Sequence, residues 1–258
     1  MALHPVRLPV RLLRFARFST AALRDLSRTV TPFEAASGTT DYRRRAEWTH
    51  RHARILCRIM NLNVTHSGAV PQAQVYGSNH LGYLDIVTIA STTPVVFVSK
   101  AEVRHWPVVG RLATGGGTLY LQREKRGELT GVIRQFEEVA RHGIPVVVFL
   151  EGTSSGGASV LPFRPSLLAP AVEAGWQVAP VALDYAISKG TVAQEVAYWR
   201  DMTFVPHFFN LLSAERLDAR VTYGAARPAG ADRKLLARQL HDEVVRLRHP
   251  LASGAAVR

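Results

Sequence analysis

The chain of 258 residues has a single cysteine, Cys57, and no uninterrupted apolar run long enough to cross a membrane. One cysteine excludes an internal disulfide framework, which fits a reducing compartment. A membrane-spanning helix needs about 20 mostly apolar residues, so a simple transmembrane segment is not expected. The first residues also lack the apolar core and small-residue cleavage site of a secretory signal.

Several functional signatures are missing as well. No His/Cys group has the spacing of a zinc site, and His105, His142 and His207 are scattered. Gly152–Gly156 fits the pattern Gly-x-Ser-x-Gly, but no helix is expected directly after it, so the strand-to-helix nucleophile elbow of a serine hydrolase is not expected. No nucleic-acid-binding module signature is present. We therefore expect no metal site, no cofactor and no nucleic-acid partner.

Positive charge is in excess. The chain holds 32 Lys and Arg against 20 Asp and Glu, a net charge of +12. Twelve arginines but only four acidic residues fall within residues 1–58. An excess of this size predicts an anionic partner, namely nucleic acid, an anionic membrane or an acidic carrier protein, and most of the excess is N-terminal.

Residues 3–28 have the pattern of a basic amphipathic helix that begins near Pro9. Its arginines share one arc: Arg7, Arg11, Arg14, Arg17, Arg24 and Arg28. Its apolar residues lie mainly opposite: Leu8, Leu12, Leu13, Phe15, Leu23 and Leu26. Such a helix can dock on a membrane surface; the alternative is a surface helix packed on the protein's own core. Residues 29–41 read as a linker, and a second basic helix is expected from Tyr42 to about Asn61.

From about residue 72, short Val- and Leu-rich segments alternate with helical patterns. The expected strands are 73–78, 94–99, 117–122, 144–150, 177–185 and 218–224. The expected helices are 84–91, 127–142, 165–174, 205–214 and 231–248. This alternation predicts an α/β fold with a mixed, largely parallel sheet flanked by helices. We expect three parts: membrane-docking helices over 1–62, an α/β domain over 63–250, and a disordered tail over 251–258.

His80 and Asp85 are the candidate catalytic residues. They follow an expected strand in the segment Asn79-His80-Leu81-Gly82-Tyr83-Leu84-Asp85. With a turn at Leu81-Gly82, the carboxylate of Asp85 can accept the Nδ1 proton of His80 and leave Nε2 free as a base. Taken alone, the pair is also compatible with a structural histidine beside a carboxylate at a helix start.

Three further blocks follow in order: Gly117–Arg123, Phe149–Ser154 and Val178–Leu183. Arg123 ends an expected strand, where a guanidinium can bind a phosphate through two hydrogen bonds. Lys125 and Arg126 lie beside it. Glu151 ends a strong strand, and Gly152 permits a tight turn. A proline inside a strand, here Pro180, favours an edge, an end or a bulge.

Together the four blocks resemble those of the glycerolipid acyltransferases, over about residues 45 to 225. The resemblance implies direct transfer of an acyl chain from acyl-CoA or acyl carrier protein to a hydroxyl, with His80 as base and no acyl-enzyme. It assigns the substrate-binding residues: Asn79, Gly117, Arg123, Glu151, Gly152, Thr153 and Pro180. Arg123 would bind an acceptor phosphate, the block around Pro180 would line the acyl-chain side, and Lys100 matches a further recurrent position. Leu150 replaces a family proline, and Ser154 stands where many relatives have arginine.

The implied acceptor is a lyso-lipid. The first expectation is 1-acyl-glycerol-3-phosphate, giving phosphatidic acid in membrane lipid biosynthesis. The alternative is a lyso-aminolipid such as lyso-ornithine lipid, which lacks the phosphate. A basic module that binds a membrane or nucleic acid without catalysis is the non-enzyme alternative. For the enzyme we expect a peripheral or monotopic position on the cytoplasmic face of the inner membrane.

Overall fold

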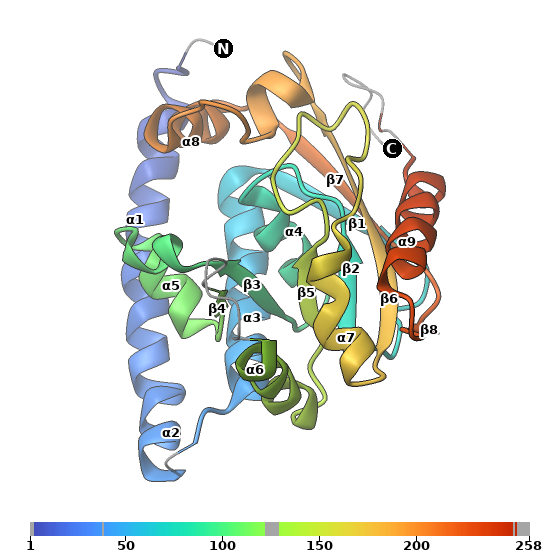
Figure 1. The fold of residues 1–258 in the computed structure, drawn as a ribbon. Coiled ribbons are helices and arrows are strands. Elements are labelled where there is room, and N and C mark those ends of the chain that lie inside the picture. The colour runs from blue at the N-terminus through green and yellow to red at the C-terminus, as the bar shows by residue number, and fades with distance from the viewer. Residues whose placement is uncertain (1–2, 38, 122–128, 250, 252–258) are drawn as a thin grey trace.

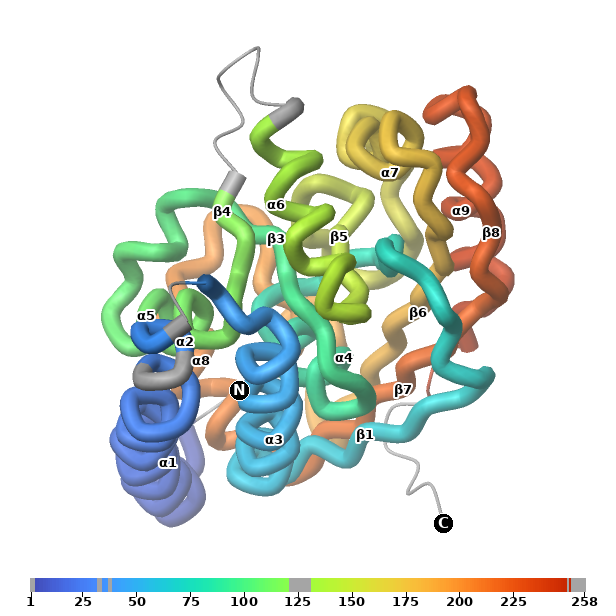
Figure 2. Tube along the Cα trace, turned by 90° about the horizontal axis from the view of Figure 1, so that it is seen from below, coloured from blue at the N-terminus to red at the C-terminus, as the bar shows by residue number. Residues whose placement is uncertain are grey.

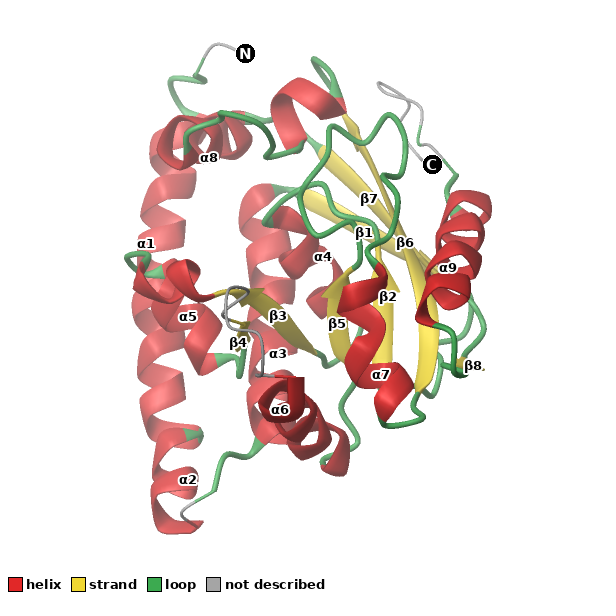
Figure 3. Ribbon diagram, in the orientation of Figure 1, coloured by secondary structure: helices red, strands yellow, loops and turns green. Residues whose placement is uncertain are grey.

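The computed structural model describes residues 3–37, 39–121, 129–249 and 251. One sheet runs through the middle, with helices on both of its faces (Figure 1, Figure 3). The strands are β1 (Leu62–Ser67), β2 (Val75–Ser78), β3 (Val96–Lys100), β4 (Leu119–Leu121), β5 (Val146–Phe149), β6 (Gln177–Ile187), β7 (Leu217–Tyr223) and β8 (Arg227–Pro228). The α-helices are α1 (Arg7–Thr29), α2 (Thr31–Ser37), α3 (Tyr42–Met60), α4 (Leu84–Thr92), α5 (Val109–Gly115), α6 (Leu129–Arg141), α7 (Ala169–Glu173), α8 (Phe204–Ser213) and α9 (Arg233–Leu247).

The strand order is β1-β7-β6-β2-β5-β3-β4, and β8 pairs with β6. The strands from β6 to β4 are parallel neighbours, whereas β7 and β8 run antiparallel to β6. The predicted mixed, largely parallel sheet flanked by helices is therefore confirmed. Each of the six predicted strands corresponds to one of β2 to β7, with bounds that differ by a few residues.

Both faces of the central strands are buried. Tyr76, Val147 and Ala179 contribute to the core beneath α3, α4 and α8, while their neighbours Val75 and Val146 contribute to the core beneath α6, α7 and α9. Parallel strands buried on both faces read as nearly continuous apolar runs, which is why β5 is easily recognised in the sequence.

Helix α1 lies on the outside of α3 (Figure 2). Its Phe18 and Ala22 pack against Trp48 of α3, while Leu13 is 61% exposed. The long apolar side of α1 is thus packed on the protein's own core, and the prediction that Leu13 belongs to that side is wrong. In the described residues no helix is both long and apolar enough to cross a membrane.

Arg11 was expected on the outer arginine arc of the N-terminal helix, and this expectation is wrong. Arg11 is 9% exposed, and its guanidinium donates to the carbonyl oxygens of Leu212 and Ala214, at the C-terminal end of α8. The last carbonyls of a helix have no partner within the helix, so a buried arginine can bind them with favourable charge. Arg11 therefore fastens α1 to α8.

The expected linker 29–41 contains the short helix α2, so that prediction is wrong over residues 31–37. The second basic helix is confirmed as α3. Asp41 caps its start by accepting from Arg44 N, and Asn61 ends it with a left-handed φ of 53°. The expected tail lies outside the described residues, except for Leu251.

Candidate active site

His80 and Asp85 lie in the loop and first helical turn after the central strand β2. Gly82 forms the turn between them with a φ of 155°, and a Cβ on it would lie 2.8 Å from Tyr198 N. The turn brings the carboxylate back, so that Asp85 Oδ2 lies 2.7 Å from His80 Nδ1. The contact expected from the sequence is present, with Asp85 at the start of α4.

Asp85 is fully buried and surrounded by donors. Its Oδ2 also accepts from Leu81 N at 2.7 Å and Gly82 N at 3.1 Å, and its Oδ1 accepts from the hydroxyl of Tyr185 at 2.8 Å. A buried charge is tolerated only when hydrogen bonds replace its water, and this set does so. The carboxylate can therefore hold one orientation of the imidazole.

The imidazole of His80 stacks on Phe149, with ring centroids 4.0 Å apart and an angle of 15° between the rings. Its side chain is 22% exposed. Because a carboxylate only accepts, Nδ1 carries the proton and Nε2 is left as the basic nitrogen. No hydrogen bond to Nε2 comes from any described residue, so this atom is available to a substrate hydroxyl.

Glu151 follows β5, the strand beside β2, and bridges two loops. Its Oε1 accepts from His80 N at 2.8 Å, and its Oε2 accepts from Leu161 N at 3.2 Å. The side chain is 2% exposed, and this burial raises the pKa of the carboxyl, against the two backbone hydrogen bonds that lower it. One oxygen thus fixes the backbone of the His80 loop, and the other fixes the backbone of the loop after β5 at Leu161.

The rest of the block after β5 turns sharply. Gly152 has a φ of 69°, and a Cβ there would lie 2.6 Å from Arg164 Cδ. Thr153 is exposed, and Ser154 Oγ donates to Tyr198 O at 2.6 Å. Ser155 N donates to His80 O at 2.9 Å. The structure therefore joins this block to the His80 loop, as expected from parallel strands that end at one edge of a sheet.

Asn79 and Pro180 both belong to the contact between β2 and β6. The Asn79 amide donates to Leu183 O at 3.0 Å and accepts from Leu183 N at 2.8 Å, with 1% of the residue exposed. Pro180 lies where the antiparallel partner of β6 changes from β7 to β8. Its lack of a backbone N–H therefore removes no hydrogen bond between β6 and either strand. Both residues are committed to the sheet.

The structure does not bring Gly117 to His80. Gly117 precedes β4 with a φ of 79° and packs against Tyr42 and Arg45 of α3, at the amino end of its strand. His80 follows the carboxyl end of β2. Lys100 ends β3 and is exposed. Arg123, Lys125 and Arg126 lie outside the described residues.

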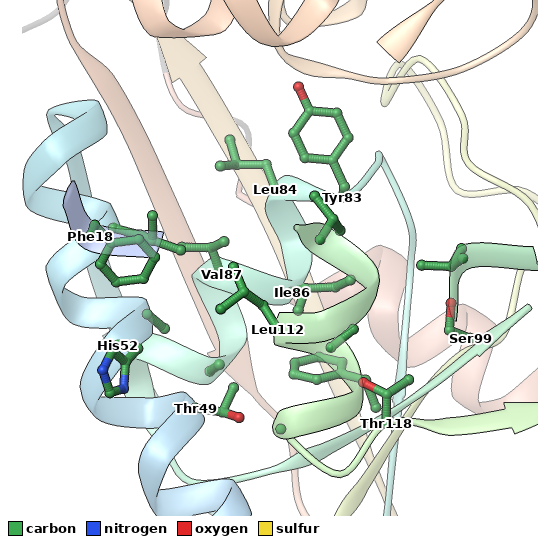
Figure 4. A pocket seen from close by; sticks show the side chains of 18 of the residues that line it. Phe18, Thr49, His52, Tyr83, Leu84, Ile86, Val87, Ser99, Leu112 and Thr118 are labelled. Atoms are coloured by element: carbon green, nitrogen blue, oxygen red, sulfur yellow. The ribbon is translucent and has the colours of Figure 1, made fainter. Parts of the chain in front are cut away.

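An apolar cavity of about 170 Å³ lies beside the His80 loop. It is bordered by Tyr83 and Leu84 at one end, and Thr49 and Thr118 lie at the other (Figure 4). Residues of α1, α3, α4, α5 and α8 form its walls. Sequence reasoning missed this cavity because its residues are spread from Phe15 to Phe208 and share no local pattern.

Within the described ranges, no group of three or more His, Cys, Asp or Glu side chains is placed to hold a metal ion.

Tyr185 contacts Asp85 but was not predicted as a site residue from the sequence. The sequence did offer a sign of it, because Asp184 and Tyr185 carry polar groups within the otherwise apolar segment 178–187.

Comparisons with known proteins agree with this geometry. A family model described as Acyltransferase matches residues 61–184. The lyso-ornithine lipid O-acyltransferase of Pseudomonas aeruginosa is 34% identical over 73% of this chain and 73% of its own length. The 1-acyl-sn-glycerol-3-phosphate acyltransferase of Neisseria meningitidis is 29% identical over 59% of this chain and 60% of its own length.

A solved structure shares the fold. The crystal structure of the 1-acyl-sn-glycerophosphate acyltransferase from Thermotoga maritima aligns with a TM-score of 0.58 and 17% identity, covering 92% of this chain and 95% of that one.

Proposed function

This chain belongs to the acyltransferase family, and from that premise we propose that it moves a fatty acyl chain from a thioester donor to the free hydroxyl of a lyso-lipid. The observation that carries the proposal is the contact of 2.7 Å between His80 Nδ1 and Asp85 Oδ2, beside an apolar cavity. Acyl-CoA and acyl carrier protein are the two donor classes that fit the basic chain.

In the proposed reaction His80 Nε2 takes the proton of the acceptor hydroxyl as its oxygen attacks the thioester carbonyl. The carbon–sulfur bond then breaks, and the imidazolium returns the proton to the leaving thiolate. Asp85 keeps the imidazole in the correct tautomer and stabilises its charged form. The products are an ester and a free thiol, so no metal, cofactor or acyl-enzyme is required.

Asn79 and Glu151 act in this proposal as positioning residues rather than as ligands of the substrate. Each uses its side chain on backbone groups that hold the His80 loop to β6 or to the loop after β5. Thr153 remains exposed beside them and is available to the acceptor. Arg123 remains a proposed ligand of an acceptor phosphate.

The apolar cavity is the proposed site of the acyl chain. One end borders Tyr83 and Leu84 of the His80 loop, and its lining is nearly all carbon. Each methylene moved from water into such a lining contributes about 0.8 kcal/mol. The family resemblance assigned the acyl chain to the side of the block around Pro180 instead, but that block is not among the cavity's lining residues.

For the acceptor, we put lyso-ornithine lipid first and 1-acyl-glycerol-3-phosphate second. The relative named for the aminolipid is more similar and matched over more of both chains than the relative named for the phosphate acceptor. The hydroxyl of Ser154, where many relatives carry an arginine, is bonded to Tyr198 O and offers a phosphate no charge. This reverses the order expected from the sequence alone.

A parallel transfer assay tests the function. Purified protein is offered lyso-ornithine lipid and 1-acyl-glycerol-3-phosphate, each with radiolabelled acyl-CoA and with acyl carrier protein. We expect acylation of the aminolipid to exceed that of the phosphate acceptor at least tenfold in kcat/KM, because no cation follows Thr153. Preference for the phosphate acceptor would reverse the assignment, and transfer to neither would contradict the proposed function.

Peripheral membrane binding is proposed from the surface of α1 and α3. Exposed arginines recur at helical spacing on both helices: Arg14, Arg17, Arg24 and Arg28 on α1, and Arg51, Arg54 and Arg58 on α3. On each helix they fall within about 80° of arc, and the ion pair between Asp25 and Arg51 marks where the two arcs meet. We call these seven residues the arginine surface. In this proposal residues 1–62 face an anionic membrane and close the cavity, while residues 63–250 carry the chemistry.

Neutralising part of the arginine surface should weaken vesicle binding. Each basic residue near an anionic bilayer contributes about 1 kcal/mol, so changing Arg24, Arg28, Arg54 and Arg58 to Gln should lower binding about a thousandfold at low salt. Co-sedimentation with vesicles containing phosphatidylglycerol measures this. The matched control changes four exposed cations of α9 to Gln, on the opposite side of the sheet: Arg233, Lys234, Arg238 and Arg246. Equal losses in the two variants would remove the assignment to α1 and α3.

A further inference from the structure

Tyr185 connects the sheet to the catalytic pair. It is a buried residue of β6, and its hydroxyl lies 2.8 Å from Asp85 Oδ1 and 2.9 Å from Thr88 Oγ1. The phenol has one proton, and an ionised carboxylate can only accept, so the O–H points at Asp85. The hydroxyl of Thr88 then donates to the phenol oxygen. Four side chains form one hydrogen-bonded chain: Thr88, Tyr185, Asp85 and His80.

The two oxygens of Asp85 are supported unequally. Oδ2 has three donors, namely His80 Nδ1 and the N–H groups of Leu81 and Gly82. Among the described residues, Oδ1 receives its hydrogen bond from Tyr185. Removing that one donor leaves half of a fully buried carboxylate without a partner, which is costly in a medium of low dielectric constant.

Tyr185 stays protonated over the range in which the enzyme works. Burial, with the nearby charge of Asp85 as a further cause, raises the pKa of its hydroxyl well above the ordinary value. Other titratable groups lie beside this hydrogen-bonded chain. Glu151, at the end of β5, interacts with His80, and Cys57 of α3 interacts with Tyr185. Substituting Tyr185 by Phe changes neither of them directly.

We propose that Tyr185 is a positioning residue of the reaction: its hydroxyl holds the Asp85 carboxylate against His80 and sets how strongly that carboxylate attracts the imidazolium proton. The proposal rests on the proposed function, in which His80 is the base. In this proposal β6 supports the catalytic loop at two points, because Tyr185 holds Asp85 and Leu183 of the same strand holds Asn79.

The test is Tyr185→Phe, which keeps the ring and removes the donor. A carboxylate that has lost a donor attracts a proton more strongly, so the imidazolium is favoured and the acidic limb of the kcat/KM profile should move to higher pH. We expect a move on the order of half a pH unit and a fall in kcat of about tenfold, with little change in KM. The low-field proton resonance of His80 Nδ1 should shift in the same variant.

Tyr76→Phe is the matched control, because Tyr76 is also buried and donates to Pro71 O at 2.7 Å without touching the pair. It should leave the acidic limb and the Nδ1 resonance in place. Thr88→Val should move both in the same direction as Tyr185→Phe, by less. Tyr185 is a packing residue if Tyr185→Phe loses no more activity than Tyr76→Phe and leaves both the acidic limb of the kcat/KM profile and the His80 Nδ1 proton resonance unchanged. The resonance is read without turnover, so it still tests Tyr185 if no acyl transfer is found.

Discussion

Replacing His80 with Ala is expected to lower acyl transfer by about 10³-fold or more, because the reaction loses its general base. Asp85→Asn should cost on the order of 10³-fold to 10⁴-fold, since an amide donates to Nδ1 and moves the imidazole proton to Nε2, the nitrogen that must accept. Initial rates with the better acceptor measure both. Donor binding should be largely kept, because neither side chain lines the apolar cavity.

The chain supplies its own control for these variants. His241 and Asp242 form a second contact between an imidazole and a carboxylate, 3.1 Å long, on α9. His241 is partly buried against Phe163 and does not contact His80 or Asp85. His241→Ala should therefore leave the rate within about twofold of the unmodified protein. A His80→Ala protein that folds normally by circular dichroism and keeps its rate would remove His80 from the reaction.

Filling the apolar cavity should change the preferred acyl chain. Ala53 on α3 lines the cavity and is 4% exposed, so Ala53→Phe places a ring where the chain would lie. Excluding about four methylenes loses roughly 3 kcal/mol, or about a hundredfold in kcat/KM for a palmitoyl donor. A hexanoyl donor, which reaches less far, should be affected much less. Competition between the two donors in one reaction gives the ratio directly.

Donor length separates this effect from simple damage. Overpacking also destabilises a core by about 1–3 kcal/mol, but that loss lowers the rate with both donors alike. Thr49→Ala, at the end of the cavity away from Tyr83, should instead favour longer chains (Figure 4). Parallel losses with palmitoyl and hexanoyl donors in Ala53→Phe would mean that the acyl chain lies elsewhere.

Much of the fold could be predicted because its signals are local. The strands of the central sheet are apolar runs in the sequence. Asp41 and Asp232 stand just before the helices that they cap, and aspartate is a common residue at a helix start. The contact of His80 with Glu151 was not predicted from the residues, but the sheet explains it, because the parallel neighbours β2 and β5 end at one edge.

The elements that were missed depend on tertiary contacts. In β1 only Leu62 is buried, so an edge strand with polar residues has no apolar pattern to detect. Helix α5 ends in glycines that disfavour a helix, yet a Cβ on Gly115 would lie 2.5 Å from Leu26 of α1. The position of α1 on the core likewise depends on partners far along the chain. The sequence pattern indicated an amphipathic helix but not which surface its apolar side would meet.

The walls contributed by α1 bear on how this protein can be trimmed for the laboratory. Phe15 and Phe18 border the apolar cavity, and Arg11 closes the end of α8. Truncation before residue 29 would therefore do more than detach an anchor. It would uncover Trp48, leave the α8 carbonyls without their cation, and open the cavity to water. A soluble version is better sought by substituting exposed residues such as Leu13 with polar ones than by shortening the chain.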